Sequence, residues 1–159
     1  SIIARDHEEK LIKSIDSGII NEAKELSSKI SVVREGIIGS ELGATAMHDA
    51  TEGGILGAVW EVAECSGVGA EIYADNIPVL ECTKKICGLA GINYLRLISS
   101  GTLVMTAFEG ERLVEALKKE GINAAVIGKI TERGKYVTIG GERKTLEPQE
   151  KDEIYKVKL

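Results

Sequence analysis

The stretch Met47-His48-Asp49-Ala50-Thr51-Glu52-Gly53-Gly54 decides how this chain folds. Before it, residues 44–47 form a short apolar run of the kind that makes a buried strand. After it, residues 55–63 carry Ile, Leu, Val, Trp and Ala at the spacing of an amphipathic helix. The paired glycines between these segments favour a tight turn. The stretch therefore predicts a strand, a turn and a long helix in direct succession.

A turn of this composition has two interpretations. The first backbone N–H groups of a helix lack partners and carry partial positive charge, and glycines let an anion approach them. Asp49 and Thr51 would add oxygens that hold a metal-bound phosphate or a polar substrate group. In the simpler interpretation, Asp49 or Thr51 is a helix N-cap and Gly53 and Gly54 only complete a turn. The stretch has no Lys after its glycines and matches neither the P-loop nor the dinucleotide fingerprint.

Several ionisable or nucleophilic side chains lie near this turn or in its helix. His48 is suited to proton exchange near neutral pH, although a lone His more often has a structural role. The segment Ser99-Ser100-Gly101 reads as a turn, without the elbow of a serine nucleophile. Glu61 and Glu64 are expected on the solvated face of the helix or in ion pairs with neighbours. None of these residues alone establishes a catalytic site.

The three cysteines, Cys65, Cys82 and Cys87, form no C-x-x-C pair. We expect them to be buried as small apolar residues in helices. A disulfide framework and a zinc site are both disfavoured, so no metal ligands are assigned, and a cytoplasmic location fits best.

Outward from the turn, strand-like and helix-like segments alternate. This order predicts an α/β fold, with a lean toward α+β, in which a mixed or mostly parallel sheet is covered by helices. No linker divides the chain, so residues 1–159 are expected to form one domain. Expected helices cover residues 6–15, 20–26, 37–42, 55–65, 80–90 and 111–120, and expected strands cover 44–47, 70–74, 102–108, 124–130 and a hairpin at 136–146.

Composition excludes some partners. The 159 residues are 43% hydrophobic and carry a net charge of −5, which suits a globular domain and gives no basic surface for nucleic acid. No apolar run is long enough to span a membrane. The start Ser1-Ile2-Ile3-Ala4 reads as the end of a strand cut from a longer protein.

An ordered set of motifs resembles the carboxy-terminal domain of the aminoimidazole ribonucleotide synthetase (AIR synthase) superfamily, closest to its hydrogenase-maturation HypE branch and AIR synthase-related proteins. Order and spacing agree over nearly the whole chain. The set comprises Met47–Gly54, Glu61–Gly69, Ile77–Val79, Cys87–Ile92, Ile98–Leu103 and Ala125–Ile130.

The resemblance implies an ATP-dependent enzyme that phosphorylates or activates a small-molecule oxygen, usually as a homodimer. In such enzymes ATP and Mg²⁺ are held mainly by an amino-terminal domain, which is absent from these residues. The Asp-x-Thr-x-Gly-Gly turn would face the cleft between the domains. Carried onto this sequence, the resemblance makes Asp49 and His48 the catalytic candidates. Thr51, Gly53, Gly54 and Ser100 become candidates for binding substrate or phosphate.

The sequence also departs from the HypE pattern. Ala50 stands where that branch typically has Pro, Glu52 where it has Arg, and Ser100 where it commonly has an acidic residue. The last residues, 153–159, contain no cysteine, whereas HypE proteins end in one that carries the group being dehydrated. The alternative is therefore a non-catalytic binding or regulatory module that retains the fold. An isolated domain of this kind is expected to be inactive by itself.

Overall fold

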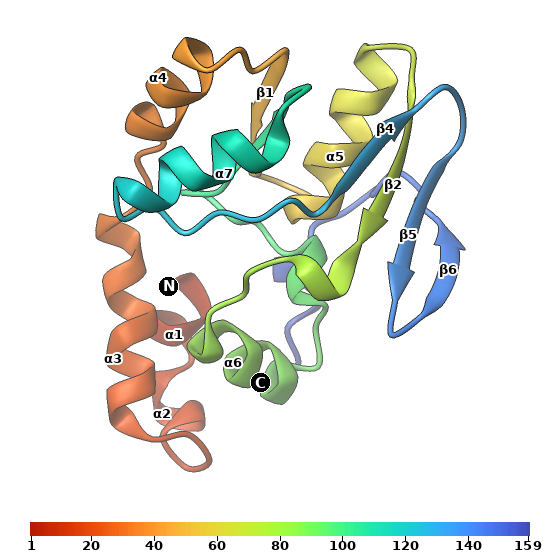
Figure 1. Ribbon diagram of the computed structural model, residues 1–159. Helices are drawn as coiled ribbons and strands as arrows, with labels where there is room; N and C mark the ends of the chain where they lie inside the picture. The colour runs from red at the N-terminus through yellow and green to blue at the C-terminus, as the bar shows by residue number, and fades with distance from the viewer.

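The predicted strand, turn and helix are all present in the computed structural model, which describes residues 1–159 (Figure 1). Strand β1 (Ala46–Asp49) leads through the turn into helix α5 (Gly54–Cys65), which ends before Gly67 as expected. Strand β1 is only half-buried, because its residues alternate between partly buried and exposed positions. The other helices are α1 (Ile2–Asp6), α2 (Glu8–Leu11), α3 (Ser17–Glu25), α4 (Val33–Glu41), α6 (Glu81–Ala90) and α7 (Gly110–Lys119).

The strands form two sheets where the sequence predicted one. The first consists of β1 and β3 (Leu103–Thr106), which run antiparallel with Asp49 opposite Leu103. The second has the order β4-β2-β5-β6, and only its β2–β5 pairing is parallel. The α/β class with mixed sheets and covering helices is thus confirmed. The strands of the second sheet are β2 (Gly69–Tyr73), β4 (Gly128–Thr131), β5 (Lys135–Ile139) and β6 (Glu142–Thr145).

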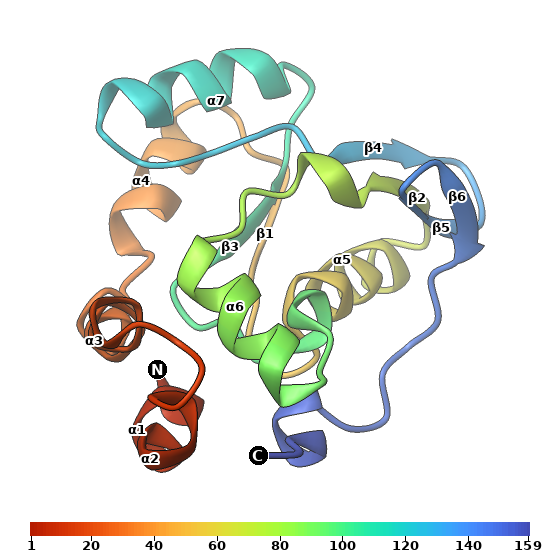
Figure 2. The same ribbon diagram turned by 90° about the horizontal axis from the view of Figure 1, so that it is seen from below.

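Helix α5 lies between the two sheets and contacts β1, β3 and β2 (Figures 1 and 2). Eight of its twelve residues are buried, so it is apolar nearly all round. Leu56 and Ala63 of α5 share one apolar core with Ile72 of β2, Val104 of β3 and Val137 of β5. This central helix fixes the turn at its own amino terminus relative to both sheets.

A second apolar core joins α1, α3 and α6, which gather at one end of the molecule (Figure 1). Ile3 and Ala4 are buried there against Cys82 and Ile86 of α6. The prediction that Ser1–Ala4 is the end of a strand is therefore wrong. The apolar run is part of a short helix, and packing in this core, mainly against α3, rather than β-propensity selects its conformation. Asp6, predicted as a helix N-cap, ends α1 instead.

Four short 3-10 turns complete the fold: η1 (Leu26–Ser28), η2 (Ala74–Asn76), η3 (Tyr94–Arg96) and η4 (Glu153–Lys156). η3 packs against the first turns of α5, and the segment from β6 to η4 returns to the same region (Figure 2). None of the helices has the length and apolar character needed to cross a membrane.

Candidate functional site

The turn between β1 and α5 has an exposed side that carries most of its polar groups. Asp49, Thr51 and Glu52 are exposed, and His48 is partly exposed beside them. These four residues include three of the candidates named from the sequence. A ligand that approaches this edge of the molecule would therefore meet carboxylates, a hydroxyl and an imidazole.

Ala50 joins this turn to a second one. Its N–H donates to the Thr102 carbonyl oxygen at 2.8 Å, and its own carbonyl accepts from the Ser99 N–H at 3.1 Å. The Ser99 and Thr102 hydroxyls bond to each other at 2.9 Å. These bonds hold the Ser99–Gly101 turn beside the Asp49–Gly54 turn, so exposed Ser100 lies on the neighbouring loop.

Gly53 and Gly54 have a packing role that the sequence did not reveal. Both adopt positive φ, 80° and 60°, a region that favours glycine. A Cβ on Gly54 would lie 2.5 Å from the Leu97 carbonyl oxygen and 2.8 Å from that of Leu95. The glycines thus let α5 begin directly against the η3 backbone. The space that a ligand would need at the Gly54 Cα is filled by the protein itself.

A buried carboxylate from the far end of the chain completes the inner side of the turn. Asp152, 3% exposed, accepts the Gly53 N–H at 2.8 Å through one oxygen. Its other oxygen accepts the Ile154 N–H at 2.8 Å and so caps η4. Sequence reasoning missed Asp152. Its only signal was an Asp placed one residue before a short helical turn.

The segment around Asp152 is fastened to η3 by further bonds. The Gln149 amide donates to the Arg96 carbonyl oxygen at 2.9 Å, and Arg96 donates to the Gln149 side-chain oxygen at 3.3 Å. The Glu153 carboxylate accepts the Asn93 N–H at 3.0 Å. Burial disfavours charge on Glu153, but the Lys156 ammonium and the Asn93 N–H outweigh it and hold the pKa of Glu153 below its usual range. Residues 149–153 thus form a strap behind the turn.

Two backbone donors at the start of α5 are left over. The Gly54 N–H donates to the Thr51 carbonyl oxygen, but the N–H groups of Ile55 and Leu56 have no acceptor within the chain. Such donors suit a phosphate oxygen. No group of three or more His, Cys, Asp or Glu side chains is arranged to hold a metal ion. The start of α5 therefore offers two unbonded backbone donors.

His48 is held by a carboxylate from α5. Its Nε2 lies 2.6 Å from Glu61 Oε2, and its Nδ1 lies 3.6 Å from Asp49 Oδ1. The expectation that Glu61 and Glu64 are solvated and paired is confirmed, since Glu64 bonds to the Lys135 ammonium at 2.5 Å. His48 is thus a partly exposed imidazole flanked by two carboxylates.

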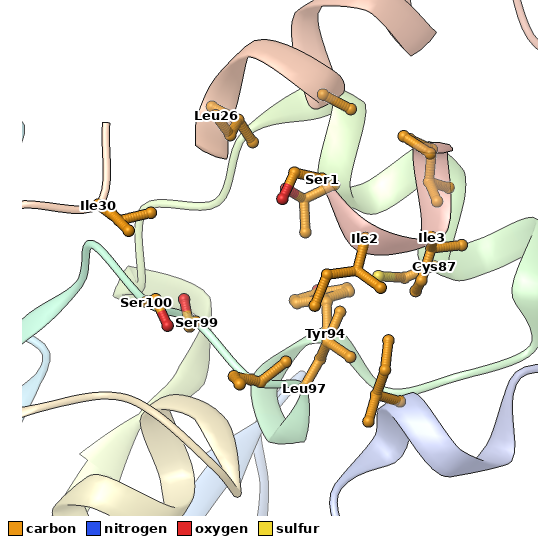
Figure 3. Close-up of a pocket in the computed structure, with 16 residues that line it drawn as sticks. Ser1, Ile2, Ile3, Leu26, Ile30, Cys87, Tyr94, Leu97, Ser99 and Ser100 are labelled. Carbon is orange, nitrogen blue, oxygen red and sulfur yellow. The ribbon is translucent and has the colours of Figure 1, made fainter. Parts of the chain in front are cut away.

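A cavity of about 180 Å³ lies behind the Ser99–Gly101 turn (Figure 3). Its wall is mainly apolar and includes Ile3, Leu26, Tyr94 and Leu97, with Ser99 and Ser100 at one side. The Asp49–Gly54 turn does not line it. The cavity therefore adjoins the candidate site without containing its ionisable groups.

Two of the three cysteines are buried and one is exposed. Cys82 and Cys87 are buried on α6, as predicted, and burial raises the pKa of both thiols, that of Cys87 to about 11. Cys65 is exposed at the end of α5, so the prediction that it is buried is wrong. Its position lies past the last apolar turn of α5, where the helix leaves the core.

Comparison with known proteins agrees with this architecture. A putative hydrogenase expression/formation protein of Methanocaldococcus jannaschii is 33% identical over 114 residues, which cover 69% of this chain and 34% of that protein. The carbamoyl dehydratase HypE of Escherichia coli is 30% identical over 131 residues, covering 80% of this chain and 37% of HypE. The chain thus spans little more than a third of these relatives.

The second of these relatives, E. coli HypE, also has a similar fold. The crystal structure of E. coli HypE superposes with a TM-score of 0.68 at 28% identity, covering 77% of this chain and 41% of that one. The family model described as "AIR synthase related protein, C-terminal domain" matches residues 3–141. The chain therefore belongs to the AIR synthase related protein family and corresponds to its C-terminal domain.

Proposed function

We propose that the chain is the carboxy-terminal domain of an ATP-dependent, HypE-like enzyme that phosphorylates or otherwise activates an oxygen of a small molecule. It would act with an amino-terminal ATP-binding domain, in a homodimer. The observation that carries the proposal is the bonding of Ala50 to Ser99 and Thr102, which sets two polar turns side by side at an exposed edge. Family membership supplies the class of reaction.

The roles divide between the exposed residues and the backbone. Asp49 and His48 are the catalytic candidates, because they bring a carboxylate and an imidazole to the exposed edge. Thr51 and Ser100 offer hydroxyls to substrate or phosphate. Gly53 and Gly54 shape the turn, and the unbonded Ile55 and Leu56 N–H groups at the start of α5 would donate to phosphate oxygens.

ATP is the cofactor that fits these groups. A HypE crystallised in complex with ATP superposes on this chain with a TM-score of 0.61 at 20% identity, a likeness of fold. The chemistry that ATP supplies is phosphoryl transfer, in which enzymes act mainly by positioning and by neutralising charge. In this chain Asp49 is the exposed carboxylate best placed to assist a Mg²⁺ ion held mainly by the other domain.

The proposal is tested by ATP hydrolysis in the two-domain protein with candidate carbonyl and amide substrates. Asp49→Ala and Thr51→Ala are expected to lower kcat/KM by about 100-fold, because they remove groups at the transferred phosphoryl. Asp6→Ala and Thr145→Ala are matched controls, exposed and remote from the turn. If both site variants keep full turnover, the site assignment is wrong.

One observation favours the alternative, a non-catalytic binding or regulatory module. The N–H of Gly53, the N-cap residue of α5, already donates to Asp152, so an anion finds fewer donors than at an open helix start. A two-domain protein that binds ATP analogues without hydrolysing ATP, across the same substrates, would support the module.

A further inference from the structure

We propose that Glu61 is a positioning residue for His48: it holds the imidazole through Nε2 and leaves Nδ1 as the proton acceptor at the ligand-facing turn. The inference rests on the proposed function, because it gives one residue of that site a defined chemical state. The fixed orientation of the His48 ring can be tested separately from any catalysis.

The fold creates this pair from residues far apart on their elements. His48 is the third residue of β1, and Glu61 lies two turns into α5. Helix α5 packs back along β1 after the turn, which brings Glu61 Oε2 within 2.6 Å of His48 Nε2. Strand β1, the Asp49–Gly54 turn and helix α5 therefore bring His48 and Glu61 together.

The two ring nitrogens are in different situations. A distance of 2.6 Å is a short hydrogen bond, in which Nε2–H donates to the carboxylate. Asp49 Oδ1 is 3.6 Å from Nδ1, too far for a hydrogen bond. In the neutral ring, Nδ1 therefore keeps a free lone pair on the side of Asp49. A carboxylate that fixes the tautomer of a neighbouring His is a known way of preparing a base.

The ring is accessible as well as oriented. The His48 side chain is 32% exposed, so Nδ1 can be reached by a ligand at the turn. A substrate O–H or N–H bond would break as the proton forms a bond to Nδ1, and its electron pair would stay on the substrate atom. The imidazolium formed would lie between the Glu61 and Asp49 carboxylates, which stabilise its charge.

No other charged group competes for the ring. The charged residues of α5 are Glu61 and Glu64, and Glu64 is engaged by Lys135. The paired strand β3 contributes Leu103, Val104, Met105 and Thr106, none of which ionises in the usual pH range. Glu61 and Asp49 are thus the ionisable groups that face His48. Glu64 offers a matched control, because it is a second exposed, ion-paired carboxylate one turn along.

The first test needs only this chain. Nitrogen-15 NMR of the imidazole rings is simple to assign, because the chain has two histidines, and His7 serves as an internal reference. At a pH where both rings are neutral, His48 is expected to show one tautomer with the proton on Nε2. Glu61→Leu should return His48 to an average of both tautomers, and Glu64→Leu should leave it unchanged. An averaged His48 in the wild-type chain would overturn the proposal.

The second test measures ATP turnover in the two-domain protein. Glu61→Leu is expected to lower kcat by about tenfold with the KM for ATP unchanged, in the range of supporting residues behind a reactive group. Glu61→Gln, which keeps an acceptor oxygen, should retain more activity. In a His48→Gln background, Glu61→Leu should have no further effect, because the pair acts as a unit. Glu64→Leu should keep the wild-type kcat.

The outcomes separate the two proposals. A wild-type protein that turns over no ATP counts against the proposed function, and the NMR result then decides the pair by itself. An active wild type whose Glu61→Leu variant keeps full kcat overturns the positioning role. Equal losses in Glu61→Leu and Glu64→Leu would also overturn it, since they would indicate a general effect of removing surface charge.

Discussion

The inner side of the Asp49–Gly54 turn is packed against the protein, whereas its outer side is exposed. On the inner side, all three small residues, Ala50, Gly53 and Gly54, are buried. Ala50 bonds to the 99–102 segment, Gly53 bonds to Asp152, and Gly54 packs against the backbone of residues 95–97. On the outer side, Asp49 and Thr51 are exposed and no side-chain hydrogen bond is found for either. Six consecutive residues thus combine a packed inner side with an open polar edge.

This difference divides the residues of the motif into those that pack the turn and those that face solvent. A glycine can mark a motif because the backbone needs it, and at Gly54 the need is close packing against residues 95–97. An exposed Asp or Thr that supports no packing has no such explanation and points to a ligand. Substitutions on the inner side should therefore change stability, and those on the outer side should change binding.

Gly54→Ala should give the largest effect on stability. The new Cβ would meet two backbone carbonyl oxygens within 2.8 Å, and the residue would keep a φ of 60°. Strain at positive φ and overpacking against a rigid backbone together predict a loss of about 3 kcal/mol in the free energy of unfolding. Urea unfolding followed by circular dichroism measures it.

Gly67→Ala is the matched control. Its φ of 66° is similar, but nothing lies within 4 Å of the added Cβ. Its expected loss is about 1 kcal/mol, from backbone strain alone. Equal losses for the two variants would show that Gly54 is needed for its φ rather than for contact with η3.

Asp152→Ala should have the next largest effect. It leaves the buried Gly53 N–H and the partly buried Ile154 N–H without an acceptor, at a cost of about 2 kcal/mol. Asp75→Ala is the control, because the Asp75 carboxylate also accepts a backbone N–H, from Gly140, but is exposed; about 0.5 kcal/mol is expected there. If both variants unfold at the same urea concentration, the strap does not stabilise the turn.

Local pattern explains what the sequence predicted well. The β1–α5 unit, the helix at Glu81–Ala90 and the hairpin around Gly140-Gly141 were all predicted because periodicity and turn residues lie within a few positions of each other. The helix expected over residues 20–26 begins at Ser17, because Gly18 does not break it. Gly18 lies in the first turn of α3, where its N–H donates to the Asp16 side chain at 2.8 Å, so the helix begins earlier than the apolar pattern.

Contacts between distant residues explain what the sequence did not predict. Gly53 and Asp152 are 99 positions apart, and no local pattern links them. The separation into two sheets depends on how α5 inserts between β1 and β2, which is also a matter of tertiary packing. The grouping of His48 with Glu61 follows from that packing. The sequence therefore placed the candidate residues near one another along the chain, but it did not give their contacts.

Alkaline pH should weaken the second core. The pKa of Cys87 is about 11, above its ordinary value of 9.0, because burial disfavours the thiolate. The folded chain therefore holds this proton more tightly than the unfolded chain, so stability is full below pH 9 and declines as pH rises toward 11. The loss should approach about 2 kcal/mol, and Cys87→Ala should flatten it even though it is itself less stable. Urea unfolding at several alkaline pH values measures it, and an equal decline in Cys87→Ala would contradict it.

The smallest effect on stability is expected on the outer side of the turn. Asp49→Ala and Thr51→Ala should each change the free energy of unfolding by less than about 0.5 kcal/mol, since neither side chain is buried. The same substitutions should reduce the rise in melting temperature that an ATP analogue gives the two-domain protein, because linkage converts weakened binding into weakened stabilisation. Gly54→Ala reverses the pattern: it lowers the melting temperature without ligand. An outer variant that destabilised the free protein as much as Gly54→Ala would place Asp49 or Thr51 in the packing of the turn, and the division of the motif into two sides would fail.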